Sequence, residues 1–96
     1  MTKATHVLQT PSFKKAVKKL RQNQRKDLDT AIKALMASPL LGEQKKGDLA
    51  FLRVYKFTIS KQLTLLGYRF DNGTLTLELL ALGSHENCYR DIKRSI

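Results

Sequence analysis

LTLLGYRFDNGTLTLELLAL, residues 63–82, decides the fold. Two apolar runs, Leu63–Phe70 and Thr74–Leu82, flank the triplet Asp71-Asn72-Gly73. Asn and Gly accept the positive φ angles of a tight turn, so the stretch predicts an antiparallel hairpin. Alternate residues of the second run are expected on one face of the sheet: Leu75, Leu77, Leu79 and Ala81.

A third strand is predicted upstream, over Phe51–Thr58. Alternation gives it two faces, Leu52, Val54 and Lys56 on one and Arg53, Tyr55 and Phe57 on the other. Because consecutive strands with short links pair antiparallel, the three strands form a meander. Leu40–Asp48, with glycines as breakers, is expected to be a loop.

The part of the chain before this loop is expected to be largely helical. A short strand, His6–Gln9, precedes Thr10-Pro11, where a hydroxyl can cap a helix and proline suits its first position. Apolar residues of the first helix then recur at helical spacing: Phe13, Ala16, Val17 and Leu20. A second helix is predicted over Gln24–Ala37, and a last one over Glu86–Arg94.

The element order is therefore β-α-α-β-β-β-α, an α+β fold in a single domain, residues 1–96. An N-terminal strand and a helical hairpin pack on an antiparallel meander, and a short C-terminal helix follows. The hairpin must cover one face of the sheet, because its apolar stripe needs an apolar partner. The other face is expected to be open and to hold any functional site.

Charge is the first indication of a partner. The net charge is +10, and residues 1–26 contain eight Lys and Arg but no acid. Such an excess attracts RNA, DNA, an anionic membrane or an acidic protein. The alternative is a solvated basic face that only keeps the protein in solution.

Several functional classes are excluded. The single cysteine, Cys88, forms no intramolecular disulfide, and two histidines with one cysteine do not form a zinc site. No apolar stretch approaches the ~18 residues of a membrane helix, and no signal-peptide core is found, so a reducing, cytoplasmic setting is expected. Phosphate-binding, dinucleotide, HExxH and GxSxG motifs are lacking.

Few residues can carry acid–base or phosphate chemistry. The candidates are Arg53, Tyr55 and Lys56 on one strand, His85 and Tyr89 near the last helix, and Arg69, Lys45 and Lys46 as further cations. Metal-independent RNA cleavage needs a base for the 2′-hydroxyl, an acid for the leaving 5′-oxygen and cations for the transition state. Histidine suits proton transfer and arginine suits phosphate. Taken singly, each is as readily a cap, a surface residue or a packing residue.

Two segments resemble a known family. Gly67-Tyr68-Arg69-Phe70, the acidic turn, the strand Leu75–Leu82 and Gly83-Ser84-His85-Glu86-Asn87-Cys88-Tyr89 resemble the C-terminal half of RelE/ParE-superfamily toxins. The hairpin ending at Ser38-Pro39 and the basic loop Gln44–Asp48 are also similar. The resemblance spans nearly the whole chain and depends on the order of elements together with the final Gly-Ser-His-Glu-Asn-x-Tyr segment.

The resemblance implies a toxin of a type II toxin–antitoxin module. RelE- and YafQ-like members cut mRNA, commonly in the ribosomal A site, and need no cofactor. His85, Tyr89 and Arg53 match functional positions, and Lys56 and Arg69 add phosphate contacts. This chain departs from members that have several histidines or a central-strand arginine, for which Gln62 or Arg69 lies nearest. Other members inhibit DNA gyrase and cut nothing, which is the alternative function. An acidic antitoxin is the implied partner, besides mRNA and the ribosome.

Overall fold

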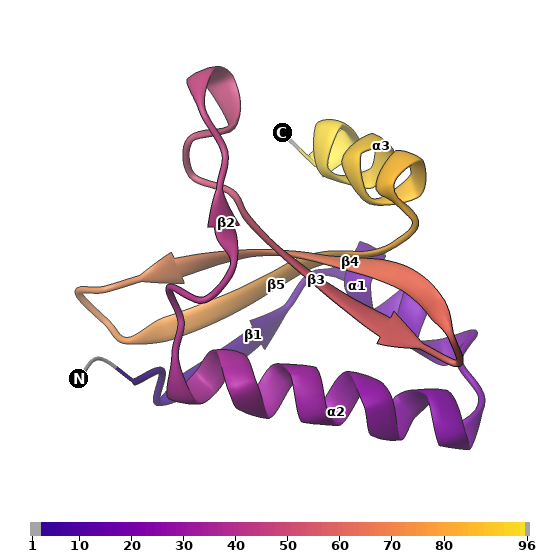
Figure 1. The fold of residues 1–96 in the computed structure, drawn as a ribbon. Coiled ribbons are helices and arrows are strands. Elements are labelled where there is room, and N and C mark those ends of the chain that lie inside the picture. Colours follow the sequence, from indigo (N-terminus) through magenta and orange to yellow (C-terminus); the bar gives the residue numbers. More distant parts are fainter. Residues whose placement is uncertain (1–2, 96) are drawn as a thin grey trace.

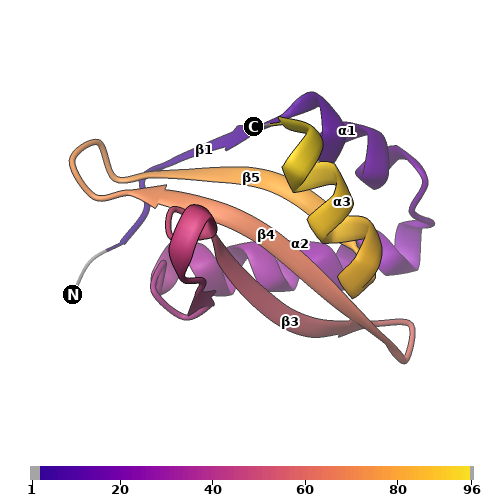
Figure 2. The ribbon, with the colours of Figure 1, turned by 90° about the horizontal axis from the view of Figure 1, so that it is seen from above.

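Five strands form one mixed sheet in the order β1-β5-β4-β3-β2 (Figure 1). The computed structural model describes residues 3–95, so Met1, Thr2 and Ile96 of the expected domain lie outside the described residues. The elements are β1 (His6–Gln9), α1 (Pro11–Lys18), α2 (Gln22–Ala37), β2 (Glu43–Gln44), the 3₁₀ helix η1 (Gly47–Leu49), β3 (Arg53–Ile59), β4 (Gln62–Asp71), β5 (Thr76–Gly83) and α3 (His85–Ser95). The predicted meander β3-β4-β5 is antiparallel, and β1 adds to it parallel to β5 (Figure 2).

The first two helices begin at side-chain caps. Thr10 Oγ1 accepts the N–H of Phe13 at 3.2 Å and donates to the carbonyl of Leu80 at 2.8 Å, which fixes the start of α1 against β5. The second helix starts two residues earlier than predicted. The side chain of Gln24 accepts the backbone N–H of the N-cap residue Arg21 at 2.8 Å, and this bond marks the true start.

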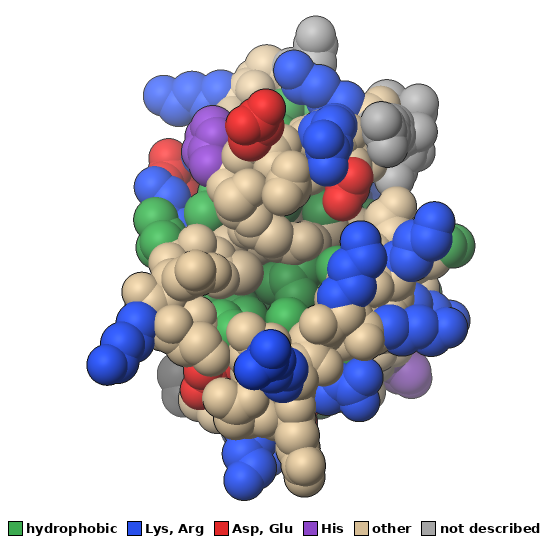
Figure 3. All heavy atoms as spheres, turned by 90° about the vertical axis from the view of Figure 1, so that its right-hand side faces the viewer, with side chains coloured by type: hydrophobic (Ala, Val, Ile, Leu, Met, Phe, Trp, Pro, Cys, Tyr) green, Lys and Arg blue, Asp and Glu red, His purple; other side chains and the backbone are tan. Residues whose placement is uncertain are grey.

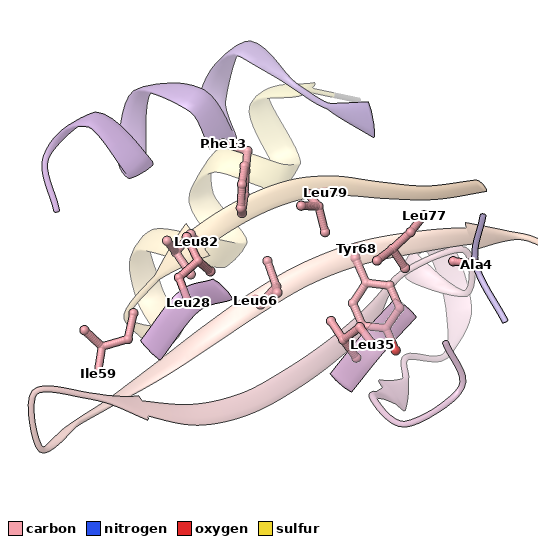
Figure 4. Packing of buried hydrophobic residues seen from close by; sticks show 10 residues of the cluster. All are labelled: Ala4, Phe13, Leu28, Leu35, Ile59, Leu66, Tyr68, Leu77, Leu79 and Leu82. Atoms are coloured by element: carbon pink, nitrogen blue, oxygen red, sulfur yellow. The ribbon is translucent and has the colours of Figure 1, made fainter. Parts of the chain in front are cut away.

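The main core lies between the sheet and the hairpin of α1 and α2, as the apolar stripes predict (Figure 4). Its buried residues come from the segment before β1, from both helices and from strands β3, β4 and β5: Ala4, Phe13, Leu28, Leu35, Ile59, Leu66, Tyr68, Leu77, Leu79 and Leu82. Tyr68 is fully buried, and its hydroxyl donates to the Pro39 carbonyl at 2.6 Å. The same oxygen accepts the Gly42 N–H at 2.9 Å, so this tyrosine ties the loop after α2 to the sheet.

The expectation of an open second face is wrong. Helix α3 packs across β4 and β5 on that face (Figure 2), over a second buried cluster: Leu52, Val54, Leu65, Leu80, Ala81, Cys88 and Ile92. A Cβ on Gly67 would lie 2.7 Å from Ile92 Cδ1, so the missing side chain lets α3 approach the sheet.

A bulge explains why Ala81 does not share a face with Leu77 and Leu79. Gly67 pairs with Ala81 but Tyr68 pairs with Leu79, so Leu80 is an extra residue on β5. The bulge shifts the alternation, which sends Leu80 and Ala81 to the second cluster and Leu82 back to the main core. Alternation alone could not show this.

The predicted positive φ angles at Asn72 and Gly73 are also wrong. Instead Leu75 has φ +55°, outside the strand in which it was expected. Asp71 Oδ1 accepts the N–H groups of Gly73 at 2.9 Å and Thr74 at 3.4 Å, and these bonds form the turn. They also lower the pKa of the Asp71 carboxyl.

The tighter hairpin turn lies between β3 and β4. Ser60 and Lys61 both have positive φ, 48° and 69°, and Ile59 pairs with Gln62 across them. Two such residues define a type I′ turn, which favours glycine at its second position.

We expect Lys61→Gly to raise the free energy of unfolding by about 0.5–1 kcal/mol, measured by urea unfolding. Lys33→Gly, in the middle of α2, is the control and should lower it by about 1 kcal/mol. A destabilised Lys61→Gly variant would contradict the turn assignment.

Candidate functional site

Helix α3 presents His85 and Tyr89 side by side. They lie one helical turn apart, and their ring centroids are 4.7 Å apart with planes inclined by 52°. The helix starts abruptly after β5, where Gly83 has φ +155° and Ser84 Oγ accepts the N–H of Asn87 at 3.3 Å. His85 is therefore exposed at the first turn, whereas Tyr89 is half-buried against the second cluster.

A second element brings a cation to this pair. Within the predicted loop, Glu43 and Gln44 form the two-residue strand β2, which pairs with Val54 and Arg53 of β3. With η1 it forms an arm that rises from the same face of the sheet as α3 (Figure 1). Lys45, directly after β2, places its Nζ 5.8 Å from the centroid of the Tyr89 ring and 3.8 Å from Glu43 Oε1.

The surroundings of Lys45 keep it protonated. A hydrogen bond with the Tyr89 side chain raises its pKa most, and the charge interactions with Tyr89 and Glu43 raise it further against a partial desolvation. An ammonium so held is a poor base at neutral pH. It is a suitable counter-charge for a phosphate beside Tyr89.

Lys56 lies on the same face of the sheet. It is exposed on β3 and pairs with Leu65 of β4, which in turn pairs with Gly83 of β5. Lys56, Leu65 and Gly83 are therefore paired side by side on three neighbouring strands, and Gly83 directly precedes Ser84. Adjacent strands are about 4.8 Å apart, so its Cα lies about 10 Å from that of Gly83.

The expected convergence of Arg53 with His85 and Tyr89 is not observed. Strand alternation places Arg53 on the main-core face, opposite α3. Its Nη1 donates to the carbonyls of Gly42 at 2.8 Å and Leu40 at 3.3 Å, so this guanidinium holds the loop after α2.

Tyr55 and Arg69 also lie away from the pair His85 and Tyr89. Tyr55 packs against the main core, stacked on Phe57 at 5.8 Å between ring centroids. Arg69 is exposed near the β4–β5 turn, 3.9 Å from Glu78 by its Nε, and lines a hollow of about 630 Å³ together with Arg53. Lys46 is exposed next to η1.

Cys88, on α3, is buried against Gly67 of β4. Burial raises the pKa of its thiol to about 11, which opposes any role as a nucleophile. We expect the native protein at about pH 8 to react with a thiol reagent at least about 100-fold more slowly than free cysteine, because thiolate is that much scarcer. Unfolding in urea should restore the ordinary rate, and rapid reaction of the native thiol would contradict its burial.

Two further findings concern residues 3–95. Among the side chains that the structure describes, no three His, Cys, Asp or Glu gather as a metal site would require. None of the helices in this range combines the length and apolar character needed to cross a bilayer.

Comparison with known proteins decides the family. The family model described as "ParE-like toxin of type II bacterial toxin-antitoxin system" matches residues 7–93. The chain belongs to the ParE-like toxin family. No curated protein sequence matches the toxin.

Solved structures share the toxin's fold. It is similar to a mutant of Escherichia coli toxin RelE in the free state, in which two arginines are replaced by alanine, with TM-score 0.75, 15% identity and coverage of 100% of this chain and 99% of that one. It is also similar to a chain of the toxin–antitoxin complex RelBE2 of Mycobacterium tuberculosis, with TM-score 0.63, 21% identity and coverage of 85% and 91%. These structures confirm the α+β fold with a short C-terminal helix, and the family match over residues 7–93 confirms the resemblance to the RelE/ParE superfamily.

Proposed function

We propose that this toxin is a metal-independent endoribonuclease that cuts mRNA, with the ribosome as the setting of the cut. The observation that carries the proposal is the group formed by His85, Tyr89 and Lys45. Two side chains able to exchange protons touch each other, and an ammonium held in the protonated state lies beside them. A gyrase inhibitor that works by binding alone has no need of such a group.

The group matches the demands of one reaction. The 2′-oxygen of a ribose forms a bond to the adjacent phosphorus while the bond from phosphorus to the 5′-oxygen breaks. A base takes the 2′-hydroxyl proton and an acid gives a proton to the leaving oxygen, so the products are a 2′,3′-cyclic phosphate and a 5′-hydroxyl. His85 carries one of these proton transfers, and Tyr89 carries or orients the other.

Cations complete the proposed site. Lys45 faces the negative charge that develops on the phosphorane oxygens, and Lys56 extends the positive surface along the sheet. Lys46 and Arg69 are proposed to hold more distant phosphates. Arg53 has no direct part in this reaction, since its guanidinium holds the carbonyls of Leu40 and Gly42.

The family also implies an antitoxin. One structural neighbour is a toxin–antitoxin complex, and a chain of net charge +10 suits an acidic partner. We propose that such an antitoxin binds this toxin and silences it.

The direct test is cleavage of RNA by the purified toxin in EDTA, with and without ribosomes. We expect fragments ending in 2′,3′-cyclic phosphate and none at a site carrying a single 2′-deoxynucleotide. The Lys45→Gln variant should cut RNA at least about tenfold more slowly than wild type. The control is Lys18→Gln, which removes the same single positive charge from a residue outside the site. Fragments with 3′-hydroxyl ends, or activity that EDTA removes, would refute the mechanism.

A further inference from the structure

A hollow at one end of the sheet adjoins the His85 site without including it. Its volume is about 520 Å³, and its walls come from α1, the ends of β3 and β4 beside their turn, the end of β5 and the first turns of α3. Ser84 and Asn87, which flank His85 in the sequence, both line it. Figure 3 shows this end of the molecule, with apolar side chains exposed in the depression and lysine and arginine side chains around it.

Three cations and one carboxylate line the hollow. Lys15 comes from α1, Lys19 directly follows that helix and Arg90 comes from α3, while Asp91 is the acid, which leaves an excess of two positive charges. Lys15, Lys19 and Arg90 are exposed, and none of them forms an ion pair with another side chain that the structure describes. Their charges are available to an anion at the rim.

Apolar and amide groups also line the hollow. Ala16, Leu20 and Leu82 contribute to its apolar lining, and Leu63 at its edge is 64% exposed. Side-chain amides of Gln62 and Asn87 supply donors and acceptors beside this surface. An apolar surface with amides and a cationic rim suits a nucleotide, whose base is flat and whose phosphates are charged.

We infer that this hollow binds a nucleotide of the RNA strand next to the one that is cut. This inference rests on the proposed ribonuclease function, because that function places the cut phosphodiester at His85. The RNA strand then runs from His85 over the first turn of α3 into the hollow. The base lies over Leu63 and the apolar lining, and the phosphates contact Lys15, Lys19 and Arg90. A polypeptide with acidic side chains would satisfy the rim but leave the amides and the base-sized hollow unused.

The matched variants lie on α1 and on the residue that directly follows it. Lys15→Ala/Lys19→Ala removes two charges from the rim, and Lys14→Ala/Lys18→Ala removes two from other sides of α1, since neither Lys14 nor Lys18 lines the hollow. The probe is a fluorescent ten-nucleotide 2′-O-methyl RNA, which lacks the attacking hydroxyl, and anisotropy gives the dissociation constant between about 0.05 and about 0.3 M salt.

The rim double variant should bind about 20-fold more weakly at about 0.1 M salt, and its slope of log affinity against log salt should be shallower by about 1.4. The control double variant should stay within about threefold of wild type. Leu63→Ala should weaken RNA binding severalfold without changing binding of poly-L-glutamate. Equal losses in the two double variants, or poly-L-glutamate binding as tight as RNA at equal charge, would overturn the inference.

The same measurements separate this inference from the proposed function. A toxin that binds in this way but cuts no RNA would refute only the proposed activity. A toxin that cuts RNA while its two double variants bind alike would refute only the nucleotide site.

Discussion

Replacing His85 by alanine is expected to slow RNA cleavage by a factor of roughly 10²–10⁴, the usual contribution of a positioned proton-transfer group. The side chain is exposed at the first turn of α3 and its recorded contact is with the Tyr89 ring, so the loss should be chemical and not structural. The measurement is the initial cleavage rate of one RNA at saturating concentration, together with thermal unfolding of the variant.

His6→Ala is the matched control. His6 is the other histidine, exposed at the start of β1, with its Nδ1 2.9 Å from Thr5 Oγ1. It should keep the wild-type rate. If His85→Ala also keeps that rate while folded, the proton transfer assigned to His85 does not occur.

Tyr68→Phe is expected to lower the free energy of unfolding by about 2–4 kcal/mol, which corresponds to a fall in Tm of about 10–20 °C. The substitution removes only the hydroxyl, but that oxygen serves both the Pro39 carbonyl and the Gly42 N–H in a buried place. Pro39 and Gly42 are both buried, so each lost bond leaves a backbone group shielded from solvent. The loop after α2 should loosen, and with it the β2 arm that carries Lys45.

Tyr55→Phe controls for the loss of a tyrosine hydroxyl. Tyr55 is half-buried, and no hydrogen bond of its hydroxyl is recorded within residues 3–95, so we expect a change within about 0.5 kcal/mol. Urea unfolding of both variants gives the comparison. Equal stability of Tyr68→Phe and Tyr55→Phe would show that the buried hydroxyl does not hold the loop.

Periodicity in the sequence predicted the main elements, because each helix and strand has to bury an apolar face. The spacing from Phe13 to Leu20 and the alternation along residues 51–58 both correspond to faces that the structure buries or exposes as expected. The order of the elements followed from this. The bulge at Leu80 did not, because it arises from pairing between strands and leaves no mark in one strand's pattern.

The candidate site was predicted only in part. His85 and Tyr89 are in contact because they are four residues, or one helical turn, apart, and this spacing can be read from the sequence. The approach of Lys45 depends on β2, whose two polar residues show no alternation. Arg53 was assigned to the site from the family resemblance, yet its strand position turns it towards the loop carbonyls on the opposite face. The cations around the hollow come from α1, the residue that follows it and α3, which only tertiary packing brings together.

The central claim is that His85, Tyr89 and Lys45 act on one phosphodiester of mRNA. The most direct measurement is a map of RNA 5′-hydroxyl ends in cells after brief induction of the toxin or of His85→Ala, with DNA breaks scored in the same cultures. New ends within messages for the wild type alone, with intact DNA, are the predicted result. Intact messages with broken DNA after wild-type induction would contradict the claim and favour gyrase as the target.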